Sequence, residues 1–171
     1  SCSLMLKFEW PLIVPDNADV AALSAATFDI DQYLMDIADD QGLAEGLSPL
    51  EGGITVHIAC HACAQNIGQK AAQLLRQIPD TEIDVIERCS GHGGSWGVMK
   101  ENFDVALKVG KPVARAAVKS GKTYVASECP LAADHILQGM AIENQDVEHP
   151  ASPHHPIELI ALSYGLGPKA V

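Results

Sequence analysis

The sequence lacks any apolar stretch long enough to cross a bilayer, and its first third is nearly devoid of basic residues. Its apolar runs are short and interrupted by polar or charged residues, which excludes a membrane-spanning helix. It also has no basic segment followed by an apolar one, as a secretory leader would have. The chain starts with Ser1-Cys2 rather than Met, so we expect it to have been cut from a longer polypeptide.

Charge is distributed unevenly along the 171 residues, whose net charge is −11. Residues 1–51 contain ten acidic side chains and a single base, Lys7, whereas the remainder contains twelve acids and ten bases. Such an acidic surface repels phosphate-rich partners, so nucleic acid and anionic membranes are excluded as partners. The acids are most simply a solvated helical face, and a docking surface for a basic partner is the alternative.

The pattern of apolar residues predicts an α/β fold. Residues 29–40 show helical spacing, whereas the β-branched runs at 54–59, 82–87 and 123–127 predict buried strands. Helical periodicity predicts one helix over 61–77, a long helix over 98–119 and further helices near 131–141 and from Pro156. Alternation of this kind indicates a short parallel sheet covered by helices. We expect two parts: an acidic, mostly helical segment, 1–51, and a cysteine-rich α/β domain, 52–171.

Five cysteines are present, an odd number that argues against a secreted disulfide framework and favours a reducing compartment. Cys60, Cys89 and Cys129 each follow a predicted strand, with 28 and 39 residues between them. Each interval accommodates one crossover helix and the next strand. Because sites in parallel sheets form beyond the carboxyl ends of the strands, we expect these three thiols to converge.

The residues around these cysteines suit a thiolate-bound metal. Ser90-Gly-His-Gly-Gly-Ser-Trp-Gly97 places four glycines after Cys89, and glycine lets backbone N–H groups approach an anionic object. Alternatives remain open. The glycines match a dinucleotide fingerprint only loosely, Cys60-x-x-Cys63 could be a thiol–disulfide motif, and each cysteine alone is more often a core residue.

The ordered set of motifs resembles the cysteine-rich CCG domain. The matching segments are His57-Ile-Ala-Cys60-His61, Cys89-Ser-Gly-His-Gly-Gly-Ser-Trp-Gly97, Glu128-Cys129-Pro130-Leu131 and His155-Pro156-Ile157-Glu158-Leu159. This domain occurs in one of the subunits of heterodisulfide reductase and in one of those of anaerobic glycerol-3-phosphate dehydrogenase. The start of the chain resembles the end of a preceding copy, which would make this the C-terminal copy and Cys2 a ligand of the upstream site.

The resemblance implies a cytoplasmic iron–sulfur protein that carries electrons, peripheral to the inner membrane face through a partner. Its partners would be a flavin-containing or other redox subunit and an upstream domain of the same polypeptide. Arg88 stands in place of one cysteine of the family's double cysteine, and Ala132 replaces the last cysteine of the closing motif. With two ligands of the family pattern missing, an ordinary 4Fe–4S cluster is expected rather than a non-cubane double cluster.

Carried over to this sequence, the ligand positions are Cys60, Cys89 and Cys129. Cys63, one helical turn beyond Cys60, is the expected fourth ligand, and His61 and His92 are less favoured candidates. A tetrahedral set of thiolates and imidazoles would equally suit zinc. The chain is thus expected to be an electron-transfer domain rather than a complete enzyme. A zinc-stabilised structural domain and a metal-free thiol–disulfide oxidoreductase using Cys60 and Cys63 are the alternatives.

Overall fold

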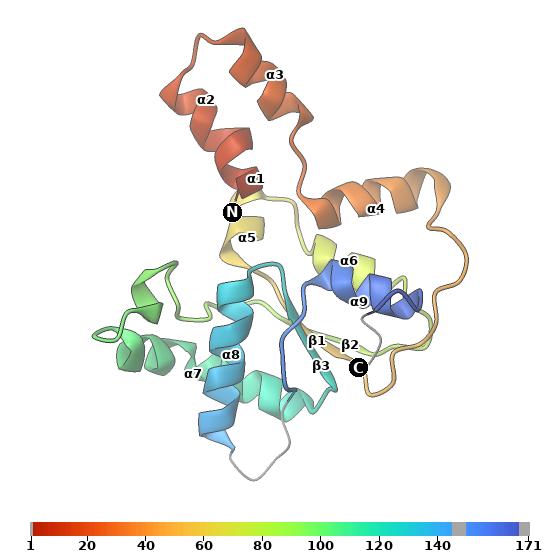
Figure 1. Ribbon diagram of the computed structural model, residues 1–171, viewed down its shortest axis with the longest axis vertical. Helices are drawn as coiled ribbons and strands as arrows, with labels where there is room; N and C mark the ends of the chain where they lie inside the picture. Colours follow the sequence, from red (N-terminus) through yellow and green to blue (C-terminus); the bar gives the residue numbers. More distant parts are fainter. Residues whose placement is uncertain (1, 145–149, 168–171) are drawn as a thin grey trace.

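A three-stranded parallel sheet lies at the centre of the protein (Figure 1). The structure is a computed structural model that describes residues 2–144 and 150–167. The strands are β1 (Ile54–His57), β2 (Ile83–Ile86) and β3 (Tyr124–Ser127), in the order β2-β1-β3. In their register, His57 at the end of β1 lies beside Ile86 of β2 and Ser127 of β3. The predicted α/β class with a short parallel sheet is confirmed.

Helices cover both faces of the sheet (Figure 1). On one face, α4 (Ile30–Gln41), α6 (Lys70–Leu75) and α9 (Pro156–Ser163) pack over β1. On the other, α7 (Phe103–Ser120) and α8 (Pro130–Glu143) enclose a smaller apolar cluster. Two covered faces leave no solvated side for β1, which explains why its four residues are all buried and why β-branched residues form it.

The prediction of a single helix over 61–77 is wrong, because the chain forms two short helices there. The first, α5 (Cys60–Gln65), ends at Asn66, whose φ of 54° is left-handed, and Gly68 also has a positive φ of 74°. Asparagine and glycine tolerate this conformation, so the backbone turns before α6 begins. Cys60 is thus the first residue of a short helix that is separate from α6.

The long helix predicted over 98–119 begins later, at Phe103. A 3₁₀ turn, η2 (Trp96–Val98), precedes it, so residues 91–102 form an extended loop between β2 and α7. Pro112 lies inside α7, and Gly121, with a φ of 64°, ends it. The loop therefore carries the glycine-rich segment after Cys89 across the end of the sheet.

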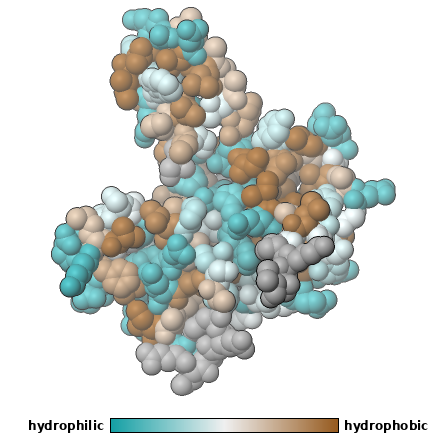
Figure 2. Space-filling view, in the orientation of Figure 1, coloured by the Kyte–Doolittle hydropathy of each residue, from teal (hydrophilic) through white to brown (hydrophobic). Residues whose placement is uncertain are grey.

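The N-terminal segment is helical, as predicted, and much of it projects from the α/β body (Figure 1). The projecting part comprises α1 (Cys2–Leu4), the π-helical turn η1 (Met5–Glu9), α2 (Trp10–Ile13) and α3 (Ala18–Ala26). Figure 2 shows apolar surface on this projection, where Leu12 and Ile13 are 81% and 77% exposed. Among the described residues, no helix combines the length and apolarity that a membrane crossing requires.

Candidate metal centre

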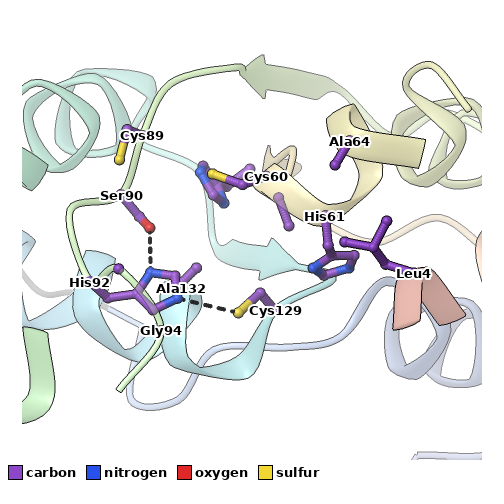
Figure 3. A pocket seen from close by; sticks show the side chains of 13 residues that line it. Leu4, Cys60, His61, Ala64, Cys89, Ser90, His92, Gly94, Cys129 and Ala132 are labelled. Carbon is purple, nitrogen blue, oxygen red and sulfur yellow. Dashed lines mark hydrogen bonds between the residues drawn. The ribbon is translucent and has the colours of Figure 1, made fainter. Parts of the chain in front are cut away.

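Three cysteines from three strand ends line one cavity. Cys60 begins α5 after β1, Cys89 lies in the loop after β2, and Cys129 caps α8 after β3. The cavity, of about 340 Å³, is lined by all three together with His61 and His92 (Figure 3). All three thiols are free of disulfide bonds. The parallel topology thus brings together residues that lie far apart in the sequence.

The three thiols influence one another electrostatically. Burial raises the pKa of Cys60 above its ordinary value, and the charges of Cys89 and Cys129 raise it further. Cys89 additionally forms a hydrogen bond with Cys60 that acts in the same direction. Because neighbouring thiolates repel one another, the raised pKa of Cys60 favours its protonated form unless a positive charge lies nearby. A metal ion supplies such a charge and releases the protons.

His92 belongs to the glycine-rich loop, and its ring lies near Cys129. Its Nδ1 is 2.8 Å from the hydroxyl of Ser90, and its Nε2 is 3.7 Å from the sulfur of Cys129 (Figure 3). Burial lowers the pKa of His92 below its ordinary value, and the charge of His135 lowers it further. A neutral imidazole held at the edge of the cavity has the protonation state that metal ligation requires.

The glycine-rich loop is pressed against α7, and this contact fixes Cys89. Gly91 has a φ of 90°, and a Cβ there would overlap the backbone of Ala106 and Gly110. A Cβ on Gly110 would in turn overlap the carbonyl oxygen of Ser90. Only glycine at both positions permits this approach, so the pair holds the segment after Cys89 at the mouth of the cavity.

Two of the candidate ligands, Cys63 and His61, are placed less favourably than the three cysteines. Cys63 is exposed and is not among the residues that line the cavity, and its sulfur is 4.0 Å from a carboxylate oxygen of Glu87. His61 lines the cavity, but its ring lies beside Leu4 of α1 (Figure 3). Cys2 is exposed on α1 and is likewise absent from the cavity wall.

Sequence reasoning missed His57, which connects the ends of all three strands. Its Nε2 donates to the carbonyl of Arg88 at 2.8 Å, and its Nδ1 accepts from the hydroxyl of Ser127 at 3.0 Å. The oxygen of Ser127 accepts from the backbone N–H of Cys129 at 3.3 Å. One buried imidazole therefore positions the residues that precede Cys89 and Cys129. The available signal was a histidine in a strand whose other residues are all β-branched.

The lowered pKa of His57 should also affect how the stability of the metal-free protein depends on pH. Burial lowers its pKa from the ordinary 6.5, so below that pH the unfolded chain takes up a proton that the folded chain does not. Unfolding is therefore favoured as the pH falls. Between about pH 7.5 and about pH 5.5, we expect His57 to contribute a decline in the urea-unfolding free energy that a His57→Gln variant lacks, while the other titratable groups contribute alike to both proteins. Equal declines in both proteins would contradict this assignment.

Comparison with curated proteins identifies distant relatives. The chain is 26% identical over 162 residues, 94% of its length, to one of the subunits of anaerobic glycerol-3-phosphate dehydrogenase of Escherichia coli K12, and covers 38% of that protein. It is 35% identical over 94 residues, 54% of its length, to an uncharacterized iron–sulfur protein of Methanocaldococcus jannaschii, covering 19% of it. Over 106 residues, 57% of its length, it is 30% identical to lactate utilization protein A of Oceanobacillus iheyensis, covering 42% of it.

The chain spans less than half the length of each of these curated relatives. No protein-family model matches it, and no solved structure matches it significantly. The chain is thus a distant homologue of a subunit of anaerobic glycerol-3-phosphate dehydrogenase and of a protein described as an iron–sulfur protein.

Proposed function

We propose that this chain carries an iron–sulfur cluster, of the 4Fe–4S type, and serves electron transfer within a larger oxidoreductase. The observation that carries the proposal is the meeting of Cys60, Cys89 and Cys129 at one cavity. Cysteine thiolates are the usual ligands of such clusters, and soft sulfur donors select iron–sulfur centres and zinc over harder metals. When bound, the cluster would supply a centre that accepts and releases single electrons.

The surrounding residues fit an anionic thiolate centre. Cys129 caps the N-terminus of α8, a helix of 14 residues opened by Pro130. The unpaired N–H groups at a helix N-terminus favour a thiolate there. The loop after Cys89 exposes Gly93 and Gly94 at the cavity, where no side chain separates the backbone from a bound group. Backbone N–H groups near cluster sulfurs are a main control of the reduction potential.

The fourth ligand has two competing candidates. Cys63 is the one predicted from the sequence, but its sulfur would have to leave Glu87 and rotate toward the cavity. His92 already lies at the cavity wall, within 3.7 Å of Cys129. His61 lies beside Leu4 and is the weakest of the three (Figure 3). We therefore favour His92 on geometry and retain Cys63 as the alternative.

Zinc is the second candidate occupant, favoured by the same donors. Three cysteines and one histidine form a common structural zinc set, and zinc requires no inorganic sulfide. A metal-free thiol–disulfide function through Cys60 and Cys63 is less well supported. Burial and the charge of Glu87 raise the pKa of Cys63, whereas an attacking cysteine needs a lowered pKa.

The proposal extends to the organisation of the whole protein. Residues 52–171 would be the cluster-carrying domain, and residues 1–51 the segment that leads into it. The chain covers 38% of the dehydrogenase subunit, so we propose that an upstream domain of the same polypeptide exchanges electrons with this centre. A flavin-containing or other redox subunit would be the second partner. The exchange would take place in the cytoplasm or at the inner membrane face.

Anaerobic purification tests the proposal. We expect a brown protein with about four iron and four acid-labile sulfide per chain and broad visible absorption that bleaches on reduction with dithionite. Stoichiometric zinc without colour would instead support the structural metal site. A metal-free protein whose Cys60 and Cys63 cycle between disulfide and dithiol with dithiothreitol would overturn both metal assignments.

A further inference from the structure

A second cluster of titratable groups lies near the cysteine cavity. Asp29 and Asp31 stand at the N-terminus of α4, and Glu128 directly follows β3. One carboxylate oxygen from each lies within 4.8 Å of the other two. All three side chains are buried, with exposed fractions of 8%, 0% and 7%. None of them belongs to the wall of the cysteine cavity.

Hydrogen bonds orient two of the three carboxylates. Asp29 accepts from the backbone N–H of Asp31 and from the hydroxyl of Ser3, both at 3.2 Å. Glu128 accepts from the backbone N–H of Ala59 at 3.3 Å through one oxygen. Both oxygens of Asp29 therefore accept a hydrogen bond, whereas the remaining oxygen of Glu128 has no partner.

Asp31 is different, because neither of its oxygens has a partner although the residue is fully buried. Within residues 2–144 and 150–167, no lysine, arginine or histidine forms an ion pair with any of the three carboxylates. An unpaired buried carboxylate is strongly unfavourable, so native proteins neutralise such a group or provide it with a cation.

A fourth oxygen is connected to the same network. Gln65, 6% exposed, donates from its side-chain nitrogen to Ser3 at 3.2 Å, and Ser3 in turn donates to Asp29. The side-chain oxygen of Gln65 has no hydrogen-bond partner. Amide oxygens are among the neutral ligands of hard cations, so Gln65, which is hydrogen-bonded to the network around Asp29, adds one more unpartnered buried oxygen.

The dimensions suit a hard divalent cation. Ca²⁺ binds oxygens at about 2.3–2.6 Å, so two of its ligands lie at most about 5 Å apart. The three carboxylate oxygens meet this limit. An all-oxygen set favours Ca²⁺, Mg²⁺ or Mn²⁺ over the metals that select sulfur and nitrogen.

Two histidines lie within electrostatic reach of the acidic cluster. Burial lowers the pKa values of His61 and His155, and the negative charge of Asp29 raises both pKa values by a smaller amount.

We propose that Asp29, Asp31 and Glu128 form a binding site for a hard divalent cation, separate from the cysteine cavity. The cation joins the start of α4 to the residue before Cys129, and through Ser3 it also anchors α1. Its role is to fix the N-terminal segment against the end of the sheet. Without the cation, burial and the neighbouring carboxylates raise the pKa of Asp31 to about 8, so a proton occupies the cluster instead.

The test is titration of the chelator-treated full chain with Mn²⁺, followed by electron paramagnetic resonance, and with Ca²⁺ and Mg²⁺ by calorimetry. At about pH 8 we expect one cation per chain with a Kd below about 1 mM. Asp31→Asn should weaken binding at least about tenfold, since it removes a charged ligand. Asp39→Asn, an exposed site on the same helix, should bind as the wild type does. No binding, or equal binding by the Asp31→Asn variant, would overturn the proposal.

Two further variants keep the test decisive. Should Asp31→Asn fail to fold, Asp29→Asn removes one charge while preserving the helix cap, because asparagine caps as well as aspartate. This variant should also weaken cation binding at least about tenfold, and unchanged binding would overturn the assignment. Cys89→Ser should retain full cation binding while losing iron, so failure of the cluster proposal and failure of this one are distinguishable.

Discussion

Replacing Cys89 with serine is expected to abolish retention of iron, and Cys129→Ser is expected to do the same. Each thiol is one of three at the same cavity, and serine is not ionised at neutral pH. Loss of a direct ligand should exceed the effect of losing a residue that only orients a ligand, which is about 10–100-fold in metal affinity. Iron and sulfide analysis of anaerobically purified variants, with visible absorption, measures the effect directly.

Cys2→Ser is the matched control, since Cys2 is a free, exposed cysteine outside the cavity wall. It should keep the iron content of the wild type. Comparing Cys63→Ser with His92→Ala identifies the fourth ligand, because only one of the two should lose iron as completely as Cys89→Ser does. Full iron in Cys89→Ser would refute the shared site.

The second large effect concerns His57. His57→Leu leaves the hydroxyl of Ser127 and the carbonyl of Arg88 without their partner. A buried polar group left unsatisfied costs about 1–3 kcal/mol. Ser127 is buried whereas Arg88 is exposed, so we expect a loss of about 1–3 kcal/mol in the free energy of unfolding. Urea denaturation of the metal-free proteins at about pH 7.5 measures it.

His135→Leu provides the matched control. His135 is 3% exposed, and neither ring nitrogen has a hydrogen-bond partner. Replacing an unpaired buried imidazole with an apolar side chain of similar size should change stability by less than about 1 kcal/mol, or increase it. Equal losses in both variants would mean that the strand-end hydrogen bonds of His57 are not what stabilises this region.

The sheet and the convergence of the cysteines could be anticipated from local pattern combined with topology. The run Ile54-Thr-Val-His-Ile-Ala59 is typical of a buried strand, and β1 occupies its first four residues. Parallel strands must end at one edge, so a cysteine after each strand identifies a common site without any knowledge of side-chain contacts. Spacing carries this information because crossover connections have a minimum length.

Features that depend on backbone detail were harder to predict. The apolar periodicity of 61–77 continues across Asn66 and Gly68, although the backbone there turns out of the helix. Periodicity records which residues face the core, and two short helices with a turn between them can satisfy it as well as one long helix. The exclusion of Cys63 from the cavity could likewise not be read from its spacing to Cys60, because that depends on a rotamer and on Glu87.

The cluster of Asp29, Asp31 and Glu128 could not be predicted from the sequence. Asp29 and Asp31 look like ordinary residues of a helix N-terminus, where acids are favoured, and Asp29 does cap α4. Glu128 lies 97 residues beyond Asp31, and nothing local shows that both are buried side by side. Only the packing of α4 near the end of β3 makes them neighbours.

The most direct measurement is cysteine alkylation in the loaded and metal-free proteins, read by mass spectrometry. If the three thiolates share one centre, loading protects Cys60, Cys89 and Cys129 together, in proportion to bound iron, while Cys2 stays reactive. If any one of those three reacted as fast in the fully loaded protein as in the metal-free one, the sulfurs from the three strand ends would not be sharing a single centre.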